Sequence, residues 1–198
     1  MSPQMSDPLG TAHRYFDQAR YGIRQATALA DGIRVGLADL AAAVRLVMVR
    51  TARLDEERWA VLSERAKHVR AACQEMLTHL TATHTATTRV GTQLVGVDVD
   101  ALGRRARQHA YSLAVASIGI SGVLRLTLPV GARVCARLAE IEDAYARRAA
   151  RGLAASVELI ERAIDDLAAI AELLAATSAI PSDKASTQET FTQLVDHG

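Results

Sequence analysis

Apolar residues recur along the first quarter of the chain at alternating spacings of three and four residues. Such spacing places them on one side of an α-helix, and its persistence over about five heptads is typical of a long helix packed nearly parallel to its neighbours. Asp7 and Pro8 form a favourable helix start, because Asp can cap free amides and Pro suits the first helical position. The pattern predicts a helix over about 7–53, with a seam at Phe16, Ala19, Ile23, Ala26, Ala30, Ile33, Leu37, Leu40, Val44, Val47, Thr51 and Leu54.

The pattern resumes out of phase after Leu54, where the acidic run Asp55-Glu56-Glu57 occurs. A tight reversal with Asp55 capping a second helix is the favoured interpretation, and one continuous helix with a phase slip is the alternative. The second helix is predicted over about 55–90, before a break at 91–98. Its seam is Trp59, Leu62, Ala66, Val69, Cys73, Met76, Leu80, Thr83 and Thr87.

Two further helices are predicted over about 99–127 and 129–177. Asp98 or Asp100 would cap the third helix. Pro129 lacks an amide hydrogen and biases Leu128 away from helical angles, so we expect a turn or sharp kink at about 127–130. The predicted fold is an all-α, elongated antiparallel four-helix bundle with coiled-coil-like packing.

The predicted helices belong to one domain over 1–180, followed by a polar, flexible tail over 181–198. In an up-down-up-down bundle with these lengths, the start of the first helix and the end of the fourth would extend past the two shorter helices. Because apolar seams seldom stay exposed, they would form a two-helix stalk or be covered by another chain.

A run without formal charge extends from Ala110 to Leu124. It is shorter than the roughly 20 residues that a spanning helix needs, and Arg125 interrupts it. Each glycine inside a helix costs about 1 kcal/mol relative to alanine, and close approach of another backbone can offset that cost. We therefore expect the third helix to be buried on most sides. Close helix packing is expected at Ser117, Gly119 and Gly122 of this helix and at Gly32 and Gly36 of the first helix.

The same run has two alternative interpretations. In the first, residues 110–134 form a membrane-active hairpin folded about Pro129, which stays concealed until a trigger releases it. In the second, the run lines a pocket for a lipid or another apolar ligand.

Charge and composition narrow the class of partner. The chain has 23 Lys and Arg against 22 Asp and Glu, so its net charge of +1 predicts no nucleic-acid partner. The preference for Arg over Lys is typical of a GC-rich bacterial genome. The first residues lack the pattern of an export signal, so we expect a cytoplasmic protein in which Cys73 and Cys135 are reduced thiols.

No pattern predicts chemistry. The chain contains no Glu-x-x-His pair of the kind that helical bundles use to bind two metals, and no phosphate-binding loop, dinucleotide fingerprint or nucleophile elbow. Arginines at 133 and 137 are expected to pair with acids at 140, 142 and 143. We therefore expect no catalytic residue, cofactor or metal site.

These patterns favour a non-enzymatic interaction or scaffold protein that acts through apolar helix seams and self-associates or binds a protein partner. Phe191, Leu194 and Val195 could anchor a short docking peptide in the tail. The alternative function is membrane activity of the 110–134 segment.

Overall fold

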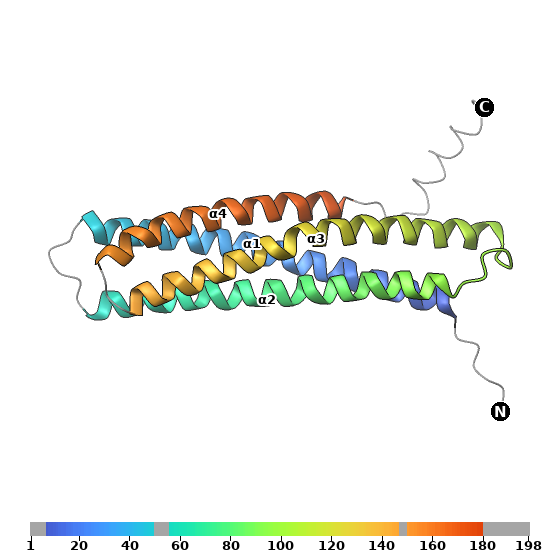
Figure 1. The fold of residues 1–198 in the computed structure, drawn as a ribbon, viewed down its shortest axis with the longest axis horizontal. Helices are drawn as coiled ribbons and strands as arrows, with labels where there is room; N and C mark the ends of the chain where they lie inside the picture. The colour runs from blue at the N-terminus through green and yellow to red at the C-terminus, as the bar shows by residue number, and fades with distance from the viewer. Residues whose placement is uncertain (1–6, 50–55, 147–149, 180–198) are drawn as a thin grey trace, which may run out of the picture.

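The computed structural model describes residues 7–49, 56–146 and 150–179. Within those ranges it contains four helices and no strand: α1 (Pro8–Val49), α2 (Glu56–Val95), α3 (Arg104–Ala146) and α4 (Ala150–Ser178). Successive helices run in opposite directions along one axis (Figure 1). The predicted all-α, antiparallel four-helix bundle is therefore confirmed.

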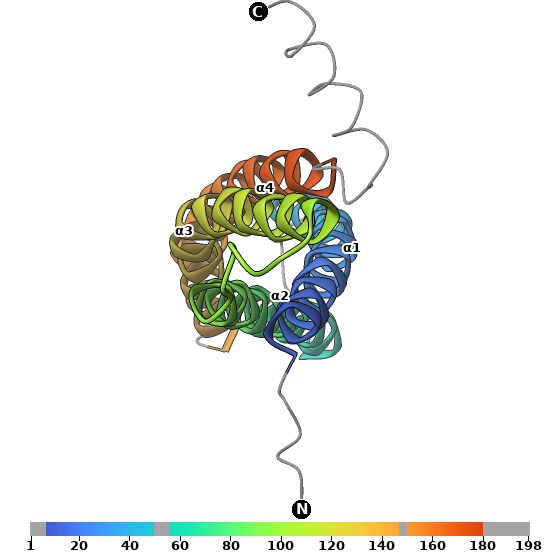
Figure 2. The same ribbon diagram turned by 90° about the vertical axis from the view of Figure 1, so that its right-hand side faces the viewer.

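The helices form a ring around one shared core (Figure 2). α1 and α3 each pack against both α2 and α4, whereas α1 and α3 touch only slightly. All nine predicted seam residues from Phe16 to Val44 are buried, as are all nine from Trp59 to Thr87. Burial of each large aliphatic side chain contributes about 1.5–3 kcal/mol to stability, so the seam residues supply most of the hydrophobic driving force for folding.

The start of α1 follows the prediction. The Gly10 amide donates a hydrogen bond of 3.0 Å to Asp7 Oδ1, and the Thr11 amide donates one of 3.0 Å to the Asp7 carbonyl. The chain then reverses direction between Val49 and Glu56, also as predicted. Asp55 itself lies outside the described residues, so its capping role stays a prediction.

The predicted cap of the third helix was wrong. α3 begins at Arg104, and the Arg107 amide donates to the Gly103 carbonyl at 3.0 Å. Asp98 instead organises the preceding loop, because its Oδ1 accepts hydrogen bonds from the amides of Asp100 and Ala101.

The predicted helix boundary and turn at 127–130 were also wrong, because Pro129 lies inside the continuous helix α3. Pro129 and Arg125 are both exposed, so water can solvate the Arg125 carbonyl that Pro129 leaves without its usual donor. On the opposite face, buried Leu124, Thr127 and Val134 carry the seam across the proline. Residues 129–146 therefore belong to α3, and the chain reverses again between Ala146 and Ala150.

As a result, the fourth helix is the short one. α4 ends beside Phe16 and Ile120, whereas α3 continues from Ile120 to Arg104, a distance of about 24 Å at 1.5 Å per residue (Figure 1). The expected two-helix overhang is absent from the described helices. The bundle instead has a four-helix section along α4 and a three-helix section beyond its end. In the latter, α1 and α3 meet directly, with the rings of His13 and His109 5.1 Å apart.

An aromatic pair lies near the opposite end of α3. The Trp59 and Tyr145 rings meet edge to face with centroids 6.1 Å apart, and both side chains are buried. Burial also raises the pKa of Tyr145, so its phenol stays protonated at neutral pH.

Candidate interaction surface

An exposed apolar stripe follows the outer side of α3. It consists of Tyr111, Val115, Ile118, Gly122 and Leu126, and we call it the α3 stripe. Its four side chains larger than glycine are 68%, 52%, 72% and 61% exposed, in chain order. At 100° per residue, the stripe lies opposite the buried face formed by Leu113, Ile120 and Leu124. Both faces of this part of α3 are therefore apolar, but only one is covered.

This exposure corrects the expectation that the third helix is buried on most sides. α3 is the one helix among those described that is long and apolar enough to cross a membrane, over Arg104–Tyr145. Its most apolar 18-residue window has a mean hydropathy of 1.7, yet only 33% of that window is buried. The apolar run does not form a hairpin about Pro129 and is not concealed.

The α3 stripe differs from other exposed apolar side chains. Val35 and Leu46 of α1 are each 60% exposed, but the exposed acids Asp31 and Asp39 lie on the same side of that helix. Residues 108–124 of α3 include no Asp, Glu, Lys or Arg. Contiguous exposed apolar surface of this kind is typical of a binding site, whereas single exposed apolar side chains are common on any protein.

The glycines selected from the sequence occupy different environments. Gly36 lies against α2, because a β-carbon added there would be 3.0 Å from Val69 Cγ2. At Gly32 and Gly122 an added β-carbon would meet nothing within 4 Å. Gly119 is exposed beside the α3 stripe. Close packing at Gly32 or Gly122 therefore requires a second molecule.

Closer helix approaches occur at two other glycines. A β-carbon at Gly22 of α1 would lie 2.1 Å from Thr83 Oγ1 of α2. One at Gly131 of α3 would lie 2.6 Å from Leu77 Cδ2 of α2. Gly131 was not expected to be a close contact, because in the sequence it falls at the start of the predicted fourth helix, next to the expected turn or kink at about 127–130.

Ser117 belongs to the buried side of α3 rather than to the stripe. It is 6% exposed, and its hydroxyl has no hydrogen-bond partner in the part of the chain that the structure describes. Ser117 therefore does not contribute to the exposed surface.

Four arginines flank the α3 stripe. Arg104, Arg105 and Arg107 precede it, and Arg125 lies beside its end; all four are exposed. Within the described ranges, none of them pairs with a carboxylate. The surface around the α3 stripe therefore combines apolar side chains with unneutralised positive charge.

The four-helix section has a different arrangement of charge. Its helices are joined by ion pairs of Arg45 with Glu161, Arg70 with Glu142 and Arg137 with Asp166. Arg133 also approaches Asp166 at 3.8 Å. Arginines 133 and 137 therefore share an acidic partner on α4, whereas Glu142, one of the acids predicted to pair with them, pairs with Arg70 of α2.

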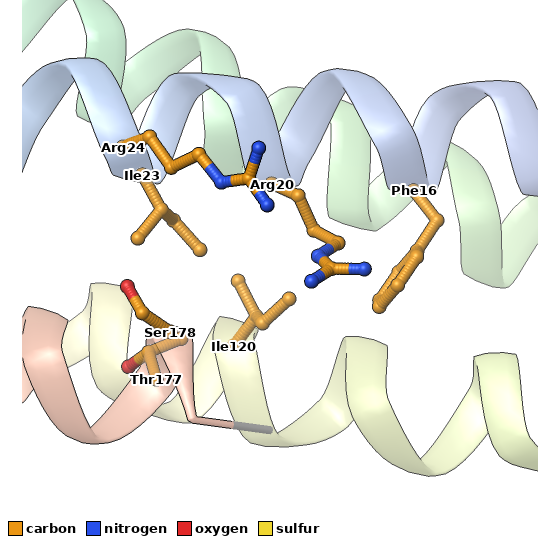
Figure 3. Close-up of a pocket in the computed structure, with 7 residues that line it drawn as sticks. All are labelled: Phe16, Arg20, Ile23, Arg24, Ile120, Thr177 and Ser178. Atoms are coloured by element: carbon orange, nitrogen blue, oxygen red, sulfur yellow. The ribbon is translucent and has the colours of Figure 1, made fainter. Parts of the chain in front are cut away.

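A small notch lies where α4 ends. Thr177 and Ser178 of α4 face Ile120 of α3 across it, and Arg20 and Arg24 of α1 extend along its rim (Figure 3). Its volume is about 20 Å³, which is room for a water molecule but far below the several hundred Å³ of a typical ligand site.

No metal site appears among residues 7–49, 56–146 and 150–179, where no three His, Cys, Asp or Glu side chains converge. His79 and Glu75 lie 3.9 Å apart on α2, as their spacing of one turn suggests. The proposed docking residues Phe191, Leu194 and Val195 lie outside the described residues, so that hypothesis stays a prediction.

Comparison with models of protein families, with curated proteins and with solved structures gave no match for this chain.

Proposed function

We propose that this protein is a non-enzymatic helical interaction protein that self-associates through the α3 stripe. The observation that supports the proposal is the exposure of Tyr111, Val115, Ile118 and Leu126 along one side of a helix that is already packed on its other side. Covering these side chains with a second helix would remove apolar surface from water at about 25 cal/mol per Å².

The stripe has the geometry that helix pairing requires. Its members follow one another at spacings of four, three, four and four residues, close to the three-four spacing of the core seams. Gly119 and Gly122 leave its centre without bulky side chains, so the backbone of a second helix can approach closely. Two copies of α3 in antiparallel orientation would match Ile118 with Gly119 of the second copy and bury the whole stripe.

The charges predict how salt affects that association. Antiparallel pairing about the middle of the stripe brings Arg104 near Arg133 of the second copy. Because these charges repel, screening should favour association, so the dissociation constant of the dimer should fall as salt rises.

A second candidate function is binding to an anionic membrane surface. It is favoured by four exposed arginines that have no carboxylate partner among the described residues: Arg104, Arg105, Arg107 and Arg125. An amphipathic helix flanked by basic residues suits anionic headgroups. Each such arginine contributes about 1 kcal/mol near the membrane, and salt weakens the contribution. Salt therefore has opposite effects on the two functions.

Light scattering coupled to size exclusion, at several protein concentrations, tests self-association. Ile118→Glu places a charge in the stripe, and Val35→Glu, at a similarly exposed site on α1, is the matched control. We expect Ile118→Glu to weaken association at least tenfold and Val35→Glu to leave it unchanged. A wild-type chain that stays monomeric at high concentration and high salt would contradict the proposal.

Flotation with vesicles tests the second candidate. Vesicles with and without phosphatidylglycerol are mixed with the protein at low and high salt. Binding that requires phosphatidylglycerol, weakens with salt and is lost in Ile118→Glu supports the membrane function. Protein that stays in the aqueous fraction with both vesicles excludes it.

A further inference from the structure

We propose that Cys73 and Cys135 form an oxidisable dithiol, which closes to an intramolecular disulfide that joins α2 to α3. The two residues are 62 positions apart in sequence, yet their Sγ atoms lie 2.8 Å apart. Both are thiols in this structure. This site lies on the side of α3 that packs against α2, away from the α3 stripe, and its chemistry does not depend on self-association.

The helices approach closely at this site. One turn before Cys135, a β-carbon at Gly131 would lie 2.6 Å from Leu77 Cδ2 and 3.7 Å from Met76 Cε. Leu77 follows Cys73 by one turn of α2, so the same close approach includes both cysteines. The sulfurs are only about 0.8 Å farther apart than in a disulfide, and small side-chain rotations can close that distance.

The two thiols differ in their exposure and in the direction of their pKa shifts. Cys135 is partly exposed, whereas Cys73 is fully buried. The hydrogen bond with Cys73 lowers the pKa of Cys135, and the nearby guanidinium of Arg70 adds to that effect against the opposing effect of burial. The same hydrogen bond, with burial, raises the pKa of Cys73. Cys135 is therefore the thiolate that meets an oxidant, and Cys73 is the resolving thiol.

The oxidant is a hydroperoxide. The Cys135 thiolate attacks one peroxide oxygen, the O–O bond breaks, and the leaving alkoxide or hydroxide takes a proton, which leaves a sulfenic acid on Cys135. The sulfur of Cys73 then attacks the sulfenic sulfur, the S–O bond breaks, and water leaves with the proton from Cys73. In total, two thiols and one hydroperoxide give one disulfide, one alcohol or water, and one further water.

The disulfide would connect the helices within the four-helix section. A cross-link that closes a loop of this length restricts the unfolded chain, so the oxidised protein should unfold at a higher temperature than the reduced one. For a chain of this size we expect a rise in Tm of about 5–10 °C.

Peptide mapping of the full chain after treatment with hydrogen peroxide tests the inference. The protein is oxidised, its free thiols are alkylated, and it is digested without reductant. We expect a linked peptide pair containing Cys73 and Cys135, loss of alkylation at both cysteines, and reversal by dithiothreitol. Unlinked peptides with both cysteines alkylated, or links only between separate chains, would overturn the proposal.

Two variants supply the controls. Cys73→Ala removes the resolving thiol, so peroxide should leave Cys135 as a sulfenic acid that dimedone labels. Cys135→Ala should leave Cys73 unreactive, because Cys73 is buried. If peroxide oxidises Cys73 in Cys135→Ala as fast as it forms the disulfide in the wild type, the assigned roles are wrong. The wild-type mapping is decisive even if either variant folds poorly.

Discussion

The two sections of the bundle share one kind of core but have different exteriors. In the four-helix section, ion pairs such as Arg137 with Asp166 join neighbouring helices. In the three-helix section, α4 is absent, arginines at the start of α3 have no carboxylate partner within the described ranges, and the outer side of α3 is apolar. Heptad seams therefore determine which residues form the core, whereas the exterior side chains distinguish a surface with ion pairs between helices from one with uncovered apolar side chains.

The largest expected difference in the free energy of unfolding is between substitutions on the two sides of α3. Leu124 is 0% exposed and Leu126 is 61% exposed, although they are two residues apart. Leu124→Ala should lower the free energy of unfolding by about 2–5 kcal/mol, because it leaves a cavity in the core. Leu126→Ala should change it by less than about 0.5 kcal/mol, but should weaken association. Urea denaturation and light scattering measure the two effects. Equal destabilisation by both substitutions would show that the stripe is covered within the monomer.

Glycine-to-alanine substitutions should change stability in opposite directions at a helix contact and on the exposed side of α3. Gly22→Ala should destabilise by about 1–3 kcal/mol, because the new methyl group would overlap Thr83 Oγ1. Gly122→Ala should stabilise the monomer by up to about 1 kcal/mol, because alanine favours helix and meets nothing there. Thermal unfolding of dilute protein measures both changes. A lower Tm for Gly122→Ala would indicate a contact at this position.

Arginine substitutions should give the smallest differences in stability between a paired and an unpaired site. Arg137 is partly buried, pairs with Asp166 and also donates a hydrogen bond of 3.0 Å to the Arg162 carbonyl, so Arg137→Gln should cost about 1–2 kcal/mol. Arg125→Gln should leave stability unchanged, because Arg125 is exposed and unpaired within the described ranges. Chemical denaturation at low and high salt is the measurement. A large loss for Arg125→Gln would mean that this side chain has a structural partner.

The sequence predicted the helical class and most of the core, because burial follows the spacing of apolar side chains. The seams of the first two helices were correct at every position from Phe16 to Val44 and from Trp59 to Thr87. The error at Pro129 arose because a local rule was given more weight than the seam. Tertiary packing of Leu124, Thr127 and Val134 keeps the helix continuous through a proline whose outer side faces water.

The candidate surface could not be placed from the sequence. Residues 110–124 are apolar on both sides of the helix, and the sequence does not show which side a neighbour covers. That answer depends on how α3 packs against α2 and α4, which the spacing along a single helix does not give. The pairing of Cys73 with Cys135 was missed for a similar reason, because it depends on how α2 and α3 align across 62 residues.

The aromatic pair of Trp59 and Tyr145 provides an optical probe of one end of the molecule. Trp59 is the only tryptophan, and Tyr145 lies about 50 Å along α3 from the start of the stripe at Tyr111. The emission of Trp59 should therefore shift when its buried ring becomes hydrated during unfolding. It should stay constant when a ligand covers the α3 stripe. Unchanged emission during a titration would therefore show that the fold around Trp59 stays intact. It would not show that the α3 stripe is free of ligand.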